Sequence, residues 1–392
     1  MKIILYEWEA YGERGLYRAL KEMGFIVTTY SRKIKNHLAD EEFLTDLTLQ
    51  ITNHHIDSVF SYNYFPLIAM ACKVAKIKYI SWIFSEPHFS LYSDTVFFDT
   101  NFIFCFDRVQ MERLQGIGVT HAYHLPLATD TELFAESISQ DKIKTRDSIT
   151  FVGTLYTDER DYFSQVPYLP EYIKGYVEGI CEAQMKIYGY NMLPDVLSED
   201  ILNQMKQYIN FHMDAGYFLS FKQFIMDIIH KKITIMERSR ILKDLSETFP
   251  TTIYTGSDTG HLPLIQNGGY IHYYNQMPGI FYNSKINLNI TLRSITSGIP
   301  LRVLDVLGSG GFLLTNYQPE IAEYFENGKE LVMFENPLQL RELCKYYLEH
   351  EEERREIAEN GFHKVKEAFS YQMALWKMMK EVGTLMNDIT KI

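Results

Sequence analysis

Residues 281–315 place an arginine and an aspartate on a helix that should follow a polar, glycine-containing turn. The turn carries Arg293 and Gly298, and the expected helix carries Arg302 and Asp305. A helix N-terminus after small residues offers N–H groups and the positive end of a dipole to an anion. Arg302 adds a planar cation that suits phosphate, and Asp305 can accept bonds from vicinal hydroxyls such as those of a ribose. The arrangement therefore predicts a nucleotide site.

The same residues also have a plain structural interpretation. Gly298 and Pro300 could mark only a loop and the start of a helix. Arg302 and Asp305 could form a surface ion pair between residues three positions apart. The position of the whole arrangement between two apolar strands favours the site.

The composition describes a globular protein without a surplus of positive charge. Of its 392 residues, 46% are hydrophobic and 22% are charged, and the formal net charge is -12. This balance argues against binding to nucleic acid, whose phosphate backbone requires an excess of Lys and Arg. No apolar stretch reaches the roughly 18 to 20 residues of a membrane-spanning helix, and the N-terminus does not resemble a signal peptide. We therefore expect a cytoplasmic protein with no membrane span.

The cysteines are widely spaced, without a CxxC pair or a histidine at metal-ligand spacing: Cys72, Cys105, Cys181 and Cys344. Neither a disulfide framework nor a zinc site is expected from this spacing. No clear DxD motif is present either. We therefore expect no metal site and no cofactor. The sequence gives no indication of the oligomeric state.

Short apolar runs alternate with helical patterns in two series. The first series occupies residues 1–148 and ends in a polar, charged segment. The second series occupies residues 149–370, and a long, mostly helical region at 160–250 interrupts it. Residues 371–392 should form a C-terminal helix that packs back on the first domain. The strands expected in the second series are 149–153, 252–255, 270–274, 286–290, 312–315 and 331–334.

This alternation predicts the class of fold. Consecutive apolar positions within several runs are typical of parallel strands covered on both faces. Strand–helix–strand repetition then predicts two similar α/β domains with right-handed crossovers. Ligands of such folds bind beyond the carboxyl ends of the strands, and a cleft between two domains is the expected place.

Residues 250–370 resemble a known family. This stretch includes GIPLRVLDVLGSGGFLLTNYQPEIAEYF and is similar to the C-terminal domain of the spore-maturation (CgeB-like) glycosyltransferase family. Shorter upstream matches are ISWIFSEPHFSLYS, NFIFCFDRVQ, HLPLATD and ITFVGTLYTDERDY. The resemblance implies a GT-B fold, in which two Rossmann-like domains face each other, and a relation to the retaining enzymes of glycosyl transferase group 1. Residues 1–148 would then form the acceptor-side domain, and residues 149–370 the nucleotide-sugar domain.

The resemblance also implies roles for single residues. Arg302 matches an arginine expected near the donor diphosphate, and Asp305 matches an acid expected on the ribose. Gly153 matches a turn whose backbone lies close to the donor, and Arg160 matches a second candidate for the phosphates.

Two positions depart from the family pattern. Enzymes of group 1 often carry two glutamates eight residues apart, whereas this chain has Ser297 and Asp305. The acid that would contact the donor sugar is therefore missing or supplied elsewhere. In the N-terminal half the family often has Asp before a proline, whereas here Glu86 precedes Pro87. If an acid has a role at that place, Glu86 is the residue that performs it; otherwise the role is absent from this protein.

Glycosyl transfer needs a stabilised diphosphate leaving group, which cations and a helix N-terminus can provide without a metal. The candidate cations are Arg160, Lys285, Arg293 and Arg302. An inverting enzyme also needs a base for the acceptor proton. Glu86 and His88 are the candidates, although both could be ordinary loop residues and a retaining mechanism needs no such base.

These observations favour a metal-independent glycosyltransferase that uses a nucleotide-diphosphate sugar. Its acceptor would be a glycan, a polymer precursor or a protein. Two alternatives remain open at this point. One is a sugar-nucleotide epimerase or hydrolase on the same fold, and the other is a non-catalytic protein that binds a nucleotide sugar or a glycan.

Overall fold

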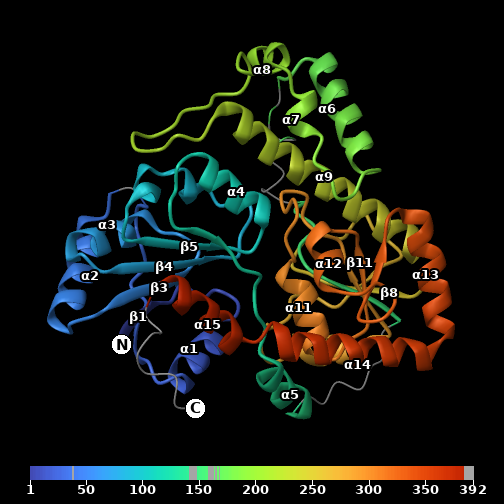
Figure 1. The fold of residues 1–392 in the computed structure, drawn as a ribbon. Coiled ribbons are helices and arrows are strands. Elements are labelled where there is room, and N and C mark those ends of the chain that lie inside the picture. The colour runs from blue at the N-terminus through green and yellow to red at the C-terminus, as the bar shows by residue number, and fades with distance from the viewer. Residues whose placement is uncertain (38, 141–147, 158–162, 164–165, 167, 384–392) are drawn as a thin grey trace. The chain divides into compact units, whose positions relative to one another are not determined.

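The computed structural model describes the chain except for residues 38, 141–147, 158–162, 164–165, 167 and 384–392 (Figure 1). The chain divides into two compact units. Unit 1 comprises Met1–Asp130, Asp214–Phe218 and Glu367–Ile392, and unit 2 comprises Thr131–Met213 and Leu219–Lys366.

Unit 1 is built on a parallel sheet with the strand order β2-β1-β3-β4-β5-β6. Every residue of the strands β3 and β5 is buried, as expected for strands covered on both faces. The strands are β1 (Lys2–Tyr6), β2 (Ile26–Tyr30), β3 (Ser58–Tyr62), β4 (Lys78–Ile83), β5 (Asn101–Cys105) and β6 (Ala122–His124).

The helices of unit 1 cover this sheet, and one hydrophobic core includes side chains of β1, β3 to β6, α2, α3 and α4. Asp40 and Asp107 cap α2 and α4 by accepting bonds from backbone N–H groups of the first turn. The helices are α1 (Glu13–Glu22), α2 (Glu41–Asn53), α3 (Pro66–Ala75), α4 (Arg108–Gly116) and α15 (Tyr371–Glu381), with the 3-10 turns η1 (Phe89–Tyr92) and η2 (Asp94–Phe97).

The C-terminal helix α15 lies against α1 within unit 1 (Figure 1). Its first residue, Tyr371, lies so close to α1 that a Cβ atom at Gly15 would come within 2.5 Å of the tyrosine ring. The hydroxyl of Tyr62 donates to the hydroxyl of Tyr371 at 3.2 Å. Glycine at position 15 therefore permits the contact that joins the end of the chain to the first helix.

Unit 2 contains a second parallel sheet, with the strand order β12-β11-β10-β7-β8-β9. Its strands are β7 (Ile149–Val152), β8 (Thr251–Tyr254), β9 (Gln266–Asn267), β10 (Ile286–Asn289), β11 (Leu313–Asn316) and β12 (Val332–Phe334). The helices outside the insertion are α5 (Thr131–Gln140), α10 (Met277–Asn283), α11 (Leu301–Gly308), α12 (Pro319–Tyr324), α13 (Pro337–Glu349) and α14 (Glu351–Ala368). The predicted α/β class with two parallel sheets is confirmed.

A helical insertion separates β7 from β8. It consists of α6 (Glu171–Gln184), α7 (Leu193–Val196), α8 (Glu199–Met205) and the long helix α9 (Phe221–Ser246), which is yellow-green in Figure 1. The insertion has a hydrophobic core of its own, which includes Ile173, Val177 and Ile229. The last turns of α9 join the core of the sheet instead, through Ile241 and Leu245. One helix thus belongs to both the insertion and the sheet.

The structure differs from the sequence-based division in two places. We placed the boundary at residue 148, whereas the compact units divide after Asp130. The helix α5 lies in unit 2 because it packs on α10 and because Phe134 contacts the ring of Tyr273. The prediction of a strand at 270–274 is wrong, since these residues form no strand and the sheet continues at Gln266–Asn267.

Gly361 gives a test of packing in unit 2. It lies in α14, where a Cβ atom would come within 2.2 Å of the Glu330 carbonyl oxygen. Gly361→Ala should therefore lower the free energy of unfolding by about 1–3 kcal/mol, as overpacking does. Gly179→Ala in α6 is the matched control, because no described atom outside its own stretch of helix lies within 4 Å of its Cβ position. The control should raise stability by about 0.5–1 kcal/mol. Equal effects in urea denaturation would contradict the close approach.

Candidate functional site

The loops that follow β7, β10 and β11 lie at one edge of the sheet, because all three strands are parallel. Gly153 directly follows β7, and its N–H donates to the Tyr254 carbonyl at 3.1 Å. Its φ angle is 156°, and an added Cβ would lie 3.3 Å from the ring of Phe151. A side chain at this position would therefore press against the Phe151 ring, which glycine avoids.

The loop after β10 is held in place from both sides. The N–H of Thr291 donates to Oδ1 of Asn316, the last residue of β11, at 2.7 Å. Further along, Oγ of Ser297 donates to Oε1 of Glu320 at 2.6 Å, and both residues are buried. Gly298 is also buried and leads into α11. These bonds fix the path of the loop before the helix begins.

Arg302 occupies the first turn of α11, after the N-cap Pro300, which provides no side-chain cap. Its guanidinium lies 2.9 Å from Sδ of Met277 and 5.3 Å from the centre of the Phe281 ring. Within the described part of the chain it forms no ion pair, so the alternative of a surface pair with Asp305 is not observed. A cation in the first turn is opposed by the helix dipole. The position therefore suits an arginine that binds an anion.

Asp305 lies one turn further along α11, with 2% of its surface exposed. The hydroxyl of Tyr273 donates to its Oδ1 at 2.8 Å. Burial raises the pKa of Asp305 to about 7, although the charge of Arg302 and the Tyr273 hydroxyl act in the opposite direction. At pH 7 the carboxyl group is therefore partly protonated.

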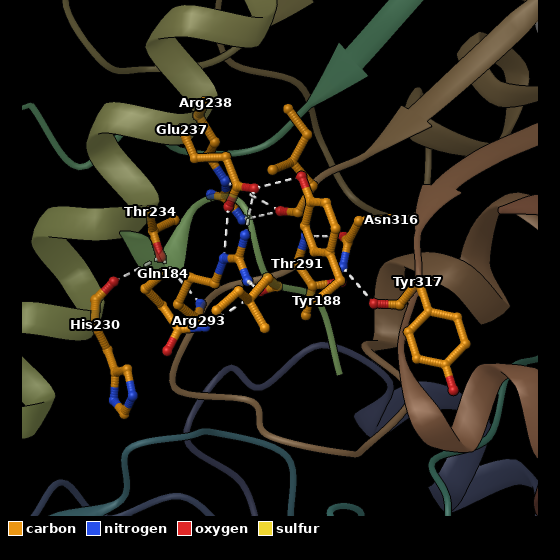
Figure 2. A network of polar contacts seen from close by, with 12 residues as sticks. Gln184, Tyr188, His230, Thr234, Glu237, Arg238, Thr291, Arg293, Asn316 and Tyr317 are labelled. Carbon is orange, nitrogen blue, oxygen red and sulfur yellow. Dashed lines mark hydrogen bonds and ion pairs between the residues drawn. The ribbon is translucent and has the colours of Figure 1, made fainter. Parts of the chain in front are cut away.

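Arg293 has a different environment from the one we predicted. Its Nε and Nη2 atoms donate to the two carboxylate oxygens of Glu237 at 2.8 and 2.6 Å, and its Nη1 donates to the Ile187 carbonyl at 2.8 Å (Figure 2). Only 10% of the Arg293 side chain and 3% of the Glu237 side chain are exposed. The guanidinium also lies 4.4 Å from the centre of the Tyr188 ring. The positive charge of Arg293 is therefore balanced inside the protein by the buried carboxylate of Glu237.

The same network includes two further bonds to the insertion. The hydroxyl of Tyr188 donates to Oε1 of Glu237 at 2.6 Å, and the backbone N–H of Arg293 donates to Oγ1 of Thr234 at 3.0 Å. Burial, followed by the charge of Glu237, raises the pKa of the Tyr188 hydroxyl. The network therefore fastens α9 to the loop after β10 with charge-assisted bonds.

Arg238 joins α9 to the carboxyl ends of two strands. Its guanidinium donates to the Ile290 carbonyl at 2.6 and 3.2 Å and to the Thr154 carbonyl at 2.6 Å. Burial lowers the pKa of Arg238, and the charge of Arg302 acts in the same direction. Two arginines from different helices therefore influence each other at this edge. Sequence reasoning missed Glu237 and Arg238, because adjacent charges in a long helix look like solvent-exposed residues.

One of the predicted cations is not placed with the others. Lys285 precedes the amino end of β10, whereas Gly298 and Arg302 follow its carboxyl end. The four residues of β10 span about 13 Å. Lys285 therefore lies at the amino ends of the strands, at the opposite side of the sheet from Gly298 and Arg302. Arg160 lies outside the described residues.

A pocket lies within unit 2, between the insertion and the loops after β10 and β11. About 350 Å³ of space lies among its lining atoms when open solvent is counted, so it is an open depression and not an enclosed cavity. The side chains of Gln184, Asn191 and His230 line it from the insertion, and Arg293 and Gln318 line it from the loops. Figure 2 shows Gln184, His230, Arg293 and Asn316 from close by.

The two candidate bases of unit 1 follow β4. Glu86 is buried, accepts a bond from the amide of Gln110 and lies 3.5 Å from Nη1 of Arg113. Nε2 of His88 lies 3.0 Å from the backbone N and 2.9 Å from the carbonyl O of Tyr64. Burial lowers the pKa of His88 to about 4, so its ring is neutral at pH 7. Both side chains hold the loop after β4 against neighbouring elements.

The described residues contain no group of three or more His, Cys, Asp or Glu side chains that could hold a metal ion. No described helix is both long enough and apolar enough to cross a membrane. The cysteines Cys72, Cys105, Cys181 and Cys344 are all free and buried.

The pair Arg293–Glu237 gives a test of the network. Arg293→Ala should lower the free energy of unfolding by about 3–5 kcal/mol, because it leaves a buried carboxylate without its partner. Arg240→Ala is the matched control, since Arg240 pairs with Glu182 on the surface, and should cost at most about 1 kcal/mol. Urea denaturation followed by circular dichroism measures both. A double variant with Arg293→Met and Glu237→Leu should recover much of the loss; no recovery would contradict this explanation.

Comparisons with known proteins identify a similar family for part of the chain and similar folds for nearly all of it. Residues 238–380 match the model of a family described as glycosyl transferase-like. A search of curated proteins finds no significant match. The matched region begins at Arg238 and includes the loop after β10 and the whole of α11.

Three solved structures illustrate the similarity of the fold. Sucrose-phosphate synthase from Thermosynechococcus elongatus shares 10% identity with a TM-score of 0.57, covering 98% of this chain and 99% of that one. Anabaena HepE, in complex with UDP and glucose, shares 10% identity with a TM-score of 0.57 and coverages of 98% and 100%. A UDP-forming trehalose-phosphate synthase from Burkholderia xenovorans shares 13% identity with a TM-score of 0.53 and coverages of 98% and 99%. The chain has the GT-B fold, and its residues 238–380 are similar to the family described as glycosyl transferase-like.

Proposed function

We propose that the protein is a glycosyltransferase that transfers a sugar from a nucleotide-diphosphate sugar bound at the carboxyl edge of the unit 2 sheet. One observation carries this proposal. Arg302 stands in the first turn of α11, within the glycosyl transferase-like part of the chain, and no described carboxylate forms an ion pair with it. A cation held against the helix dipole is stabilised by an anion, and a donor diphosphate is an anion of the right kind.

The neighbouring residues support the same place for the donor. Gly153 puts no side chain of its own at the turn after β7, and Arg238 holds the next carbonyl, that of Thr154. Asp305 lies one turn beyond Arg302 and would accept bonds from the ribose hydroxyls. The bound Anabaena HepE structures contain UDP, and one of them contains UDP-glucose, which favours a uridine nucleotide as the first donor to test.

The proposed reaction uses no metal or other cofactor. Arg302 and the N-terminus of α11 would stabilise the charge that develops on the leaving diphosphate. If the reaction inverts the anomeric centre, Glu86 and His88 are the proposed bases, and either one would have to release the bonds by which it holds the loop after β4. With retention of configuration, neither residue would need to accept a proton.

Three finer assignments belong to the same proposal. The motifs SEPHF and GIPLRVLDVLG support membership of the spore-maturation group. The four buried, free thiols support a cytoplasmic location, where thiols remain reduced. The acceptor would be a glycan, a polymer precursor or a protein.

Arg302→Ala tests the donor site. It should weaken UDP binding by about ten- to a hundredfold, because hydrogen bonds between charged groups contribute roughly 1.5–3 kcal/mol. Arg302→Lys should recover little, since an ammonium cannot replace a forked contact. Lys285→Ala, at the opposite edge of the sheet, is the control and should leave the affinity unchanged. Calorimetry measures binding, and thermal melting checks the fold. Unchanged affinity in a folded Arg302→Ala protein removes Arg302 from the site.

Chelation tests the proposal that no metal is needed. The release of UDP from UDP-glucose should continue in EDTA, because protein cations and a helix N-terminus supply the positive charge. The measurement is a coupled assay for UDP, with and without added Mg²⁺ or Mn²⁺. Loss of activity in EDTA that either ion restores would overturn metal independence.

A further inference from the structure

The pocket of unit 2 has walls that are fixed before any ligand binds. The side-chain amide of Gln184 donates to the carbonyls of Ile187 and Tyr190 and accepts from the N–H of Met192. Oδ1 of Asn191 lies 3.1 Å from Nε2 of His230. These bonds order the turn between α6 and α7, which forms the insertion side of the pocket.

The opposite wall is ordered in the same way. Oδ1 of Asn316 accepts from the N–H of Thr291 at 2.7 Å, and its amide donates to the Tyr317 carbonyl at 3.0 Å. The amide of Gln318 donates to the Ile295 carbonyl at 2.9 Å. Both walls therefore present side chains held by backbone bonds, as in ligand sites that are largely preformed.

The chemistry of the lining is neutral and polar. Amides and hydroxyls come from Gln184, Asn191, Thr291, Thr296, Asn316 and Gln318, and an imidazole comes from His230. The one arginine, Arg293, is paired with the buried carboxylate of Glu237, so the two charges cancel. Tyr190 adds an aromatic ring that is 58% exposed. Neutral donors and acceptors beside an accessible ring suit a polyhydroxylated ligand, which has many hydroxyl groups and no charge.

We propose that this pocket binds a neutral sugar unit of the acceptor, and that the helical insertion therefore helps to select the acceptor. This inference rests on the proposed function. A diphosphate fits the pocket poorly, because the charge of Arg293 is already matched by Glu237. The donor site at Arg302 and the sugar pocket share one loop: residues 291–293, 295 and 296 line the pocket, and the residues after them lead into α11. The loop would thus connect the recognition of the two substrates.

Saturation-transfer NMR on the full chain tests the proposal. The probe is a mixture of neutral sugars (glucose, galactose, mannose, N-acetylglucosamine, lactose and maltose), recorded with and without saturating UDP. At least one sugar should receive saturation in both conditions. The signal should fall by about tenfold in Asn191→Ala and in Tyr190→Ala. Matched controls are Asn203→Ala and Tyr208→Ala, which make the same changes at exposed residues of the insertion outside the pocket.

Each other outcome rejects the proposal. Absence of a signal from every sugar would show that the pocket does not bind them. Loss of the signal on adding UDP would place the sugar in the donor site. An equal loss in the two controls would show that the insertion was only destabilised. A fall in UDP affinity in Asn191→Ala, measured by calorimetry, would mean that the pocket holds the nucleotide.

The two proposals fail in different ways. If UDP does not bind and UDP-glucose is not turned over, the donor site fails, whatever the sugars do. If UDP binds and depends on Arg302 while no sugar signal depends on Asn191 or Tyr190, only the acceptor pocket fails. Tyr190→Ala keeps this distinction measurable even if Asn191→Ala does not fold, because the Tyr190 ring is largely exposed.

Discussion

The buried ion pair between Glu237 and Arg293 is the constraint on which the arrangement of unit 2 depends. Removing two charges from water is costly, and the cost is offset only when the bonds between them are well formed. Here the guanidinium binds both carboxylate oxygens, a backbone carbonyl takes a third N–H, and Tyr188 donates to the carboxylate. The pair joins residues 56 positions apart in the chain and so ties the insertion to the edge of the sheet.

The pair also divides the loop after β10 into two parts with different roles. Arg293, at the start of the loop, is neutralised within the protein, whereas Arg302, at its end, forms no ion pair among the described residues. The first part therefore presents a neutral, polar surface and the second part a positive one. A sugar suits the first and a diphosphate suits the second. Nine positions of sequence separate two chemically different environments, and the location of one carboxylate accounts for the difference.

The helical insertion is held partly by its own packing and partly by the ion pair between Glu237 and Arg293. Its helices have their own hydrophobic core, so they do not need the sheet in order to bury their apolar faces. Among the described helices of the insertion, α9 alone extends into the core of the sheet, and it carries Glu237 and Arg238 at the level of the strand ends. A rigid helix with a buried charged pair positions the walls of the pocket more firmly than a free loop would.

The sequence by itself determined the parallel sheets, the interruption of the second series by helices and the position of Arg302 in a first helical turn. These features are local: apolar runs and a proline specify strands and a helix start within a few residues. Only the tertiary structure decided that Arg293 is paired with Glu237, that Lys285 lies at the far edge, that α5 belongs to unit 2 and that 270–274 is not a strand. Each of these depends on contacts between segments distant in the chain or on strand direction. The hydrophobic periodicity of a sequence does not show which charged side chains will form ion pairs.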